Sequence, residues 1–424
     1  MSDRRIEQAY EAARERYAAL GVDTERALAA LSSVALSLPV WQADDVTGFE
    51  TRTGSLSGGI VVTGGRGGLP RSVDELRRDL DAVYALLPGR HRLNLHAIYG
   101  EFGGRQVDRD AIEPEHFAGW ADWGASRGLR LDFNATCFAH PRAETGFTLA
   151  SPDRGIRAFW IEHCGRARAV GAFLGRRQGA PAIHNLWIPD GTKDAPLDRA
   201  ERRCTLAAAL DEVFATAWPA AELKDAVESK LFGIGSESFV VGSHEFYLGY
   251  AQRAGKMVCL DLGHFHPTES VADKISSLLV FFPELLLHVS RGVRWDSDHV
   301  VLFDDAVRAV AEEIVRADAM GRVHIALDFF DGSVNRPGAL VLGARSMLRA
   351  LLVALLEPRE RLLAAQRAGD TLALLALAEE AKALPWGAVW DQHCLRHGVL
   401  PGEAWIPQVT EYERRCRSER GGER

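Results

Sequence analysis

The stretch ELLLHVSRGVRWDSDHV, residues 284–300, joins an apolar run to a cluster of charged residues. Its first half is typical of a buried β-strand, whereas its second half carries two arginines, two aspartates and a histidine. Charged side chains are rarely buried unless they are paired or bind a metal. Taken alone, the segment is equally consistent with an exposed loop held by local salt bridges. The rest of the sequence has to decide its role.

Runs with strand character recur along the chain. Their starts are separated by roughly 28 to 60 residues, which leaves room for a helix and two loops each time, as parallel strands require. The runs lie at residues 33–40, 92–99, 129–134, 181–188, 225–234, 256–264, 284–291 and 322–330.

The segments between these runs have the 3.6-residue apolar period of helices. One of them begins with Ser72 followed by Glu75, the spacing of a capping box. Eight strands that alternate with helices predict a (β/α)8 TIM barrel. The alternative is a doubly wound open sheet, but no GxGxxG motif follows the first strand.

The barrel is expected to occupy residues 1–335, including one extra helix before Ser33. Residues 336–424 are expected to form a C-terminal helical extension, with long helices from about 340 to 383. We expect this extension to pack on the barrel or on a neighbouring subunit.

Composition narrows the class of protein. The chain has 424 residues, 47% of them hydrophobic and 25% charged, and a formal net charge of −8. This charge disfavours nucleic acid and acidic membrane surfaces as partners. The first residues lack the hydrophobic stretch of a signal peptide, and the six cysteines form no CxxC pair. We therefore expect a cytoplasmic protein with free thiols that acts on a small molecule.

Chemically active side chains gather near the ends of the predicted strands, where a TIM barrel builds its active site. Each has an ordinary explanation: a lone strand histidine is usually a core residue, an adjacent acid and lysine an ion pair, and a DSD triplet a solvated loop. However, four successive strands each bring a carboxylate, and this coincidence favours one shared site. The candidate side chains are His96, Trp187, Glu228, Lys230, Asp261, His264, His288, Asp296, Asp298 and Asp328.

Five carboxylates at one barrel mouth would repel one another as bare charges. Together with two imidazoles they suit one or two Mn²⁺, Mg²⁺ or Co²⁺ ions. Cysteine is absent from these positions, which argues against a thiolate zinc site. Lys230 cannot be a metal ligand while protonated, so we expect it to donate a hydrogen bond to a substrate oxygen that becomes negative.

Several long motifs in this order resemble the bacterial L-rhamnose isomerase family over nearly the whole chain. They are WQADDVTGFE (41–50), LNLHAIY (93–99), LWIPDG (186–191), AVESKLFGIG (226–235), LDLGHFHPTE (260–269), LLLHVSRGVRWDSDHVV (285–301) and LDFFDGSVNR (327–336). The resemblance implies a metal-dependent aldose–ketose isomerase on a TIM barrel, similar in site design to xylose isomerases. It also implies a cytoplasmic homotetramer that works with two Mn²⁺ ions per subunit, with Mg²⁺, Co²⁺ or Zn²⁺ as alternatives at one site.

Carried over by position, the resemblance assigns a role to each candidate. It implies one ion held by Glu228, Asp261, His288 and Asp328, and a second held by His264, Asp296 and Asp298, with Asp261 bridging. It implies that Lys230, Asp296 and His264 act in the reaction, with Lys230 near O1 of the sugar. It further implies that His96 and Trp187 bind the rest of the sugar, and that the glycine-rich stretch 49–65 shapes an apolar pocket for its methyl end.

Three functions follow as hypotheses. The first is interconversion of L-rhamnose and L-rhamnulose, by a hydride shift or by proton transfer through an enediol. The second is a metal-dependent hydrolase on the same barrel, since clustered carboxylates with two ions also activate water. Lys230 and the DxxH and DxD order disfavour it, because a hydrolase more often carries HxH on its first strand. The third is a binding module without activity, which would require a lost ligand or a missing Lys230.

Overall fold

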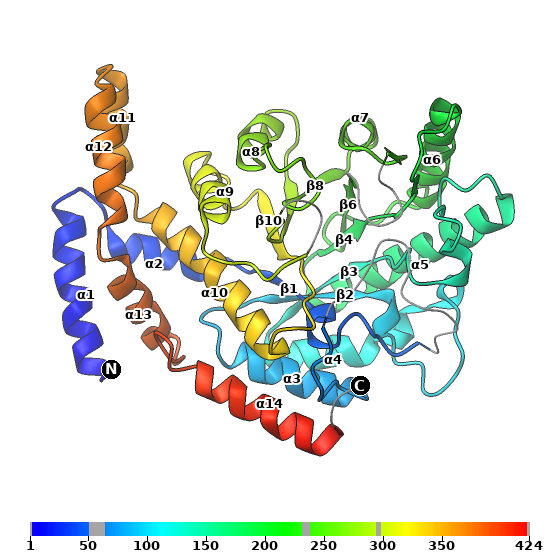
Figure 1. The fold of residues 1–424 in the computed structure, drawn as a ribbon, viewed down its shortest axis with the longest axis horizontal. Helices are drawn as coiled ribbons and strands as arrows, with labels where there is room; N and C mark the ends of the chain where they lie inside the picture. Colours follow the sequence, from blue (N-terminus) through cyan, green and yellow to red (C-terminus); the bar gives the residue numbers. More distant parts are fainter. Residues whose placement is uncertain (1, 51–63, 231–237, 294–297, 422–424) are drawn as a thin grey trace.

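Eight parallel strands close into a barrel in the computed structural model, which describes residues 2–50, 64–230, 238–293 and 298–421 (Figure 1). Around the barrel the order is β1, β2, β3, β4, β6, β8, β9, β10 and back to β1. The predicted TIM barrel is therefore confirmed, and each predicted run overlaps one of its strands. The strands are Ser37–Pro39 (β1), Arg92–His96 (β2), Arg130–Asn134 (β3), Ala182–Leu186 (β4), Leu223–Glu228 (β6), Met257–Asp261 (β8), Leu285–Val289 (β9) and Val323–Leu327 (β10).

Helices surround this barrel on its outside (Figure 1). The predicted cap is present, since Ser72 Oγ accepts a hydrogen bond from the amide of Glu75 at the start of α3. A short antiparallel pair, Gly191–Thr192 (β5) and Phe239–Val240 (β7), lies outside the barrel sheet. The helices that follow the strands are Val73–Tyr84 (α3), Ala118–Arg127 (α4), Arg154–Gln178 (α5), Arg199–Val213 (α6), His244–Ala254 (α7), Ala272–Leu279 (α8), Asp305–Arg316 (α9) and Arg336–Leu355 (α10).

Two helices precede β1, where one was predicted: Asp3–Ala18 (α1) and Thr24–Ser32 (α2). The chain breaks at Gly21, whose φ of +80° lies in the left-handed region that glycine tolerates. Asp23 then caps α2 by accepting hydrogen bonds from the amides of Glu25 and Arg26. A turn and a new cap within one apolar pattern explain the difference.

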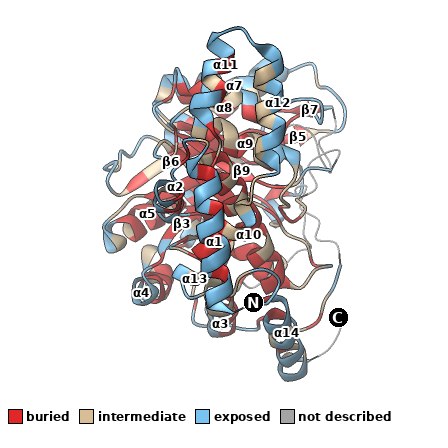
Figure 2. Cartoon of the chain, turned by 90° about the vertical axis from the view of Figure 1, so that its left-hand side faces the viewer, coloured by how far each residue is buried: buried red, intermediate tan, exposed pale blue. Residues whose placement is uncertain are grey.

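The C-terminal part consists of Arg359–Arg367 (α11), Thr371–Lys382 (α12), Trp386–Arg396 (α13) and Ile406–Arg420 (α14). Pro358 separates α10 from α11, so the helices are shorter than the sequence pattern suggests. The α11–α12 hairpin projects from the barrel, and none of the residues of α12 is buried (Figures 1 and 2). By contrast, α10 packs against α9, α2 and α3.

One described helix, α10, is long and apolar enough to cross a membrane. However, 78% of its apolar window is buried inside the protein. Its hydrophobicity is therefore explained by its place in the core, between the barrel and the helices around it.

The barrel interior is layered. Ala226, Cys259, Leu286 and Ala326 belong to a small apolar cluster inside the barrel. Because side chains alternate along a strand, the residue two positions later points the same way, one layer nearer the carboxyl end. Those next residues are Glu228, Asp261, His288 and Asp328. An apolar floor thus lies directly beneath a layer of ionisable groups.

Candidate active site

Four consecutive barrel strands bring three carboxylates and one imidazole together. Glu228 and Asp261 are the last residues of β6 and β8, His288 lies near the end of β9, and Asp328 directly follows β10. In the barrel register Asp261 lies beside His288. One ligand atom from each of the four residues lies within 4.8 Å of those of the other three. The structure therefore brings together the complete first set of predicted metal ligands.

Neighbouring side chains orient these groups. Asn185 of β4 donates a hydrogen bond to Glu228 Oε2, and the indole Nε1 of Trp41 donates one to Asp328 Oδ1 at 3.1 Å. Asp261 Oδ1 accepts hydrogen bonds from the amide of Gly263 at 2.6 Å and from the hydroxyl of Ser290 at 3.2 Å. Hydrogen bonds to ligating carboxylates fix their orientation in metal sites.

The electrostatics of this group call for a cation. Burial raises the pKa of Asp261 to about 7, and the charges of Glu228 and Asp328 act in the same direction. Burial also tends to raise the pKa of Glu228, but His288 and His264 outweigh it and hold that pKa below its usual range. Asp261 Oδ2 is buried and accepts no hydrogen bond from any described residue. A divalent ion would supply the missing partner and offset the mutual repulsion of the carboxylates.

A cysteine also lies close to the ligand group. None of the predicted ligands is a cysteine, but Cys259 of β8 pairs in register with Glu228 and forms a possible ligand group with Glu228 and His288. Cys259 lies two residues before Asp261 and therefore points to the same interior. Burial raises the pKa of its thiol to about 12, so it is a neutral thiol in the apolar floor.

A pocket opens above this group, and most of the predicted residues line it. His264 Nδ1 lies 3.2 Å from Glu228 Oε1, and its ring stacks with Trp187 at a centroid distance of 6.5 Å. Asp298, with a φ of +44°, also lines the pocket. Asp296 lies outside the described residues, as does most of the glycine-rich stretch 49–65. The predicted residues that line the pocket are His96, Trp187, Glu228, His264, His288, Asp298 and Asp328.

Lys230 lies beside the pocket, not on a strand. β6 ends at Glu228, and the Lys230 amide donates to the carbonyl of Gly242 at 3.2 Å. Its Nζ lies 5.2 Å from the centroid of the Trp187 ring, and the residue is 4% exposed. The contact between Lys230 and Trp187 therefore arises from the loop after β6, whereas the prediction placed both Glu228 and Lys230 within one strand.

His96 ends β2, which lies across the barrel from β8 and its carboxylate Asp261. Burial lowers its pKa to about 3, so the imidazole is neutral at physiological pH. Its Nδ1 lies 3.1 Å from the hydroxyl of Thr136, and its ring meets Trp41 edge-on at 4.7 Å. A neutral, oriented imidazole can exchange hydrogen bonds with sugar hydroxyls without adding charge.

The sequence analysis missed the remaining wall residues. Asn185 carried a signal, because an amide in an otherwise apolar strand must find a polar partner. The aromatic and aliphatic members look like ordinary core residues in the sequence. The missed residues that line the pocket are Trp41, Val46, Asn134, Ala135, Phe138, Asn185 and Phe330.

Comparison with known proteins shows which enzymes the chain is similar to. The family model described as L-rhamnose isomerase (RhaA) matches residues 4–420. L-rhamnose isomerase from Rhodopirellula baltica is 55% identical over 98% of this chain and 97% of its own length. Those from Pectobacterium carotovorum and Bacteroides thetaiotaomicron are 54% and 53% identical, each over 98% of this chain and 99% of their own length. These matches do not favour the hydrolase alternative.

Proposed function

Because the chain belongs to the L-rhamnose isomerase family, we propose that it interconverts L-rhamnose and L-rhamnulose by moving hydrogen between C1 and C2. The observation that carries the proposal is the group of Glu228, Asp261, His288 and Asp328 at the bottom of a pocket. In the open-chain sugar the reacting carbons each bear an oxygen, so a site that can hold cations beside a pocket suits this reaction.

We propose that the resident metal is Mn²⁺, with two divalent cations per subunit. Glu228, Asp261, His288 and Asp328 would hold one ion, and their closeness supports this assignment. His264, Asp296 and Asp298 would hold the other, with Asp261 shared. Mg²⁺, Co²⁺ or Zn²⁺ would be alternatives at one of the two sites. When bound, the cations supply Lewis acidity that polarises O1 and O2 of the sugar.

The chain's own residues then orient the sugar. Lys230 would donate a hydrogen bond to O1, and the Trp187 indole near its Nζ keeps the ammonium in place. His264 would act beside it, since its ring stacks with Trp187. His96 and Trp187 would bind the hydroxyls and the carbon face of the sugar. We assign a reactive role to Asp296 from the family resemblance alone, because it lies outside the described residues.

The reaction is tested by isotope transfer. L-rhamnose carrying deuterium at C2 is converted by the Mn²⁺-loaded enzyme, and the L-rhamnulose is analysed by NMR. Label found at C1 supports direct hydrogen transfer, whereas complete exchange with solvent supports an enediol. Parallel assays on L-mannose, L-lyxose and D-allose define the substrate range. An enzyme that forms no ketose from any of these aldoses, with metal demonstrably bound, would contradict the proposal.

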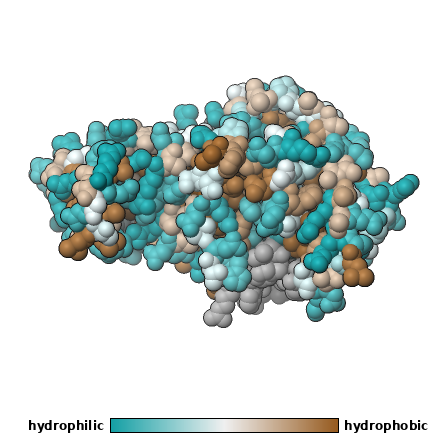
Figure 3. All heavy atoms as spheres, turned by 90° about the horizontal axis from the view of Figure 1, so that it is seen from above, coloured by the Kyte–Doolittle hydropathy of each residue, from teal (hydrophilic) through white to brown (hydrophobic). Residues whose placement is uncertain are grey.

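We propose that the enzyme is cytoplasmic and forms a homotetramer through its C-terminal extension. The proposed extension, residues 336–424, begins with α10, which packs on the barrel, whereas no residue of α12 is buried, so the α11–α12 hairpin offers a surface to neighbouring subunits. Leu372 and Leu375 of α12 are 78% and 61% exposed, and hydrophobic surface reaches the left-hand end of the molecule, where the hairpin lies (Figure 3). Apolar patches of this kind mark association surfaces.

The assembly is tested by light scattering after size-exclusion chromatography. The wild-type enzyme is expected to elute as a tetramer, and the double substitution Leu372→Asp and Leu375→Asp is expected to yield smaller species. The matched control is Leu197→Asp, at an exposed apolar residue just before α6. This substitution is expected to leave the assembly intact. A wild-type monomer would contradict the assignment.

A further inference from the structure

The loop after β3 forms one wall of the pocket in an unusual backbone conformation. Ala135 and Phe138 line the pocket. Ala139 has a φ of +51°, in the left-handed region that residues other than glycine rarely adopt. Such a conformation persists only where the surrounding structure holds it. The contacts that hold this loop therefore determine the shape of the pocket wall.

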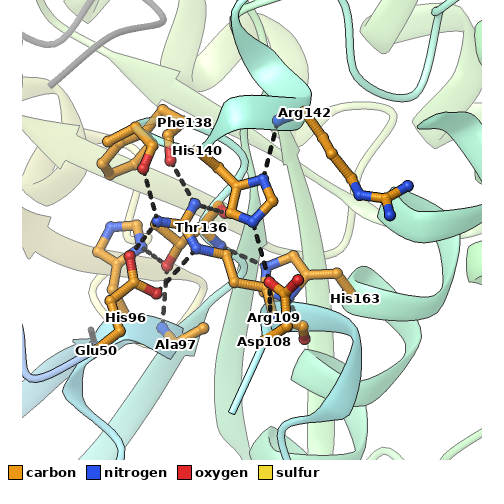
Figure 4. Close-up of polar contacts among 11 residues, drawn as sticks. Glu50, His96, Ala97, Asp108, Arg109, Thr136, Phe138, His140, Arg142 and His163 are labelled. Carbon is orange, nitrogen blue, oxygen red and sulfur yellow. Dashed lines mark hydrogen bonds and ion pairs between the residues drawn. The ribbon is translucent and has the colours of Figure 1, made fainter. Parts of the chain in front are cut away.

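Those contacts come from a buried arginine. Arg109 lies on the short helix η3 (Arg109–Ala111) between β2 and β3, and its side chain is 2% exposed. Its Nη1 donates to the carbonyls of Thr136, at 2.6 Å, and of Phe138, and its Nη2 donates to that of Ala139 at 3.2 Å (Figure 4). These bonds reach three carbonyls within four consecutive residues.

Glu50 completes the coordination of the guanidinium. Its Oε2 accepts a hydrogen bond from Arg109 Nε at 3.1 Å, and its Oε1 accepts one from Nη2 at 2.5 Å (Figure 4). A guanidinium has five N–H donors, and each of them has an acceptor here. The buried charge is paired, so the arrangement has the planar, five-bond geometry that only arginine provides.

Thr136 connects Arg109 to His96. The Thr136 hydroxyl accepts a hydrogen bond from the amide of Ala97 at 3.1 Å and lies 3.1 Å from His96 Nδ1. The Thr136 amide donates to His163 Nε2 at 2.9 Å, so His163 Nδ1 carries the hydrogen and donates to the carbonyl of Arg109 at 2.9 Å. The backbone and the side chain of Arg109 are thus both tied to Thr136 (Figure 4).

Phe138 provides a second route to the pocket. Its ring meets the His96 ring edge-on at a centroid distance of 5.6 Å and meets Trp187 at 6.1 Å. Since Arg109 holds the carbonyls of both Thr136 and Phe138, it sets two of the contacts that orient His96. Neither Arg109 nor Glu50 lines the pocket.

We propose that Arg109 and Glu50 are positioning residues that set the orientation of His96 toward the sugar, acting through Thr136 and Phe138. The proposal rests on the proposed function, because it assumes that His96 binds the substrate. It identifies two residues outside the pocket whose effect is on sugar recognition and not on metal binding.

The test compares Arg109→Lys with Arg92→Lys. Arg92, the first residue of β2, is a matched control, since its side chain is only 14% exposed and bonds Asp132 and the carbonyl of Pro181. Lysine has too few donors to replace either guanidinium. Arg109→Lys is expected to lower kcat/KM for L-rhamnose by about 10- to 100-fold, as displaced binding groups do. Its KM is expected to rise while its Mn²⁺ affinity stays unchanged. Arg92→Lys is expected to lower the Tm only.

A double-mutant cycle separates positioning from general destabilisation. In the His96→Asn background, Arg109→Lys is expected to cost less than about 3-fold in kcat/KM, because both changes remove the same interaction. Should Arg109→Lys fail to fold, Thr136→Val removes only the hydroxyl contact and is expected to raise the KM in the same way.

Five results would count against these assignments, and they are distinguishable. Equal kinetic losses in Arg109→Lys and Arg92→Lys, or an undiminished effect of Arg109→Lys beside His96→Asn, would overturn the positioning role. Wild-type kinetics for Thr136→Val would also overturn it. A wild-type enzyme that leaves L-rhamnose unchanged would instead contradict the proposed function, and wild-type kinetics for His96→Asn would contradict the role of His96 alone.

Discussion

The two halves of the barrel mouth are built from different chemistry. The ends of β6, β8, β9 and β10 supply carboxylates and an imidazole within 4.8 Å of one another. The ends of β1 to β4 supply neutral aromatic, amide and imidazole side chains: Trp41, His96, Asn134, Phe138, Asn185 and Trp187. In our account the charged half binds the cations and the neutral half binds and orients an uncharged sugar. The charged groups of this pocket therefore lie on the side where a cation can balance them.

The largest effect is expected in the charged half. Asp261→Asn removes a carboxylate whose Oδ2 accepts no hydrogen bond from a described residue. It is expected to lower kcat by about 1000-fold or more, because polarisation by a metal is worth several kcal/mol. Ketose formation and calorimetric Mn²⁺ titration measure the two consequences. Asp132→Asn, a buried carboxylate paired with Arg92 at the far end of the barrel, serves as the control. Normal Mn²⁺ binding by Asp261→Asn would contradict the assignment.

The charged half could be predicted from the sequence for a physical reason. Strand alternation places Glu228, Asp261 and His288 on the inner face, and burial of bare carboxylates is too costly without a partner. The neutral half was predicted only through His96 and Trp187. Trp41, Phe138 and Val46 look like core residues, and their side chains reach the pocket only because of the loops that follow the strands.

Long-range contacts explain the other differences. Arg109 reaches the carbonyls of Thr136 and Phe138 from a short helix 27 and 29 positions earlier, and no local pattern reveals such a bond. The break at Gly21 depends on a backbone turn inside an otherwise continuous helical pattern. Cys259 was overlooked because it resembles a small core residue until the register places it beside Glu228.

The next effect concerns the neutral half. His96→Asn is expected to lower kcat/KM for L-rhamnose by about 10- to 100-fold, since misplacing a bound substrate costs that much. Its Mn²⁺ affinity is expected to equal that of the wild type, because His96 is not part of the ligand group. Steady-state kinetics and calorimetry separate the two quantities. A parallel loss of metal affinity would show that the two halves do not act separately.

Trp41→Phe tests one direct hydrogen bond between the two halves. The substitution keeps the aromatic ring but removes the hydrogen bond from Nε1 to Asp328 Oδ1, which is 3.1 Å long. We expect Mn²⁺ affinity to fall by about 10-fold, at the lower end of the range for partners of metal ligands. Trp187→Phe is the matched control, because Trp187 donates to none of the four ligands in the described contacts. Unchanged affinity in Trp41→Phe would show that the bond has no role in metal binding.

An effect on folding alone, without a change in activity, concerns acid stability near the neutral half. Burial lowers the pKa of His163 to about 3, well below its value in the unfolded chain. The unfolded state therefore binds a proton at His163 that the folded state does not bind. The free energy of unfolding consequently falls as the pH drops below about 6.5. Between pH 6.5 and 5 this residue alone is expected to lower the free energy of unfolding by about 2 kcal/mol.

Denaturant unfolding at pH 7 and pH 5 measures this effect in the metal-stripped enzyme. His163→Gln retains an acceptor for the Thr136 amide but does not titrate, so its stability is expected to change less between the two pH values. His266→Gln, a substitution at an exposed histidine, is the matched control and is expected to retain the pH dependence of the wild type. Equal pH dependence in wild type and His163→Gln would contradict the assignment of a neutral His163.

A single titration tests most directly whether the charged half binds the cations on which isomerisation depends. Metal-stripped enzyme is mixed with L-rhamnose, and ketose formation is followed while Mn²⁺ is added and its binding is measured in the same samples. Our account predicts no L-rhamnulose without metal and activity that rises in proportion to the occupied sites. Full activity in the stripped enzyme, or bound Mn²⁺ without any ketose, would contradict it.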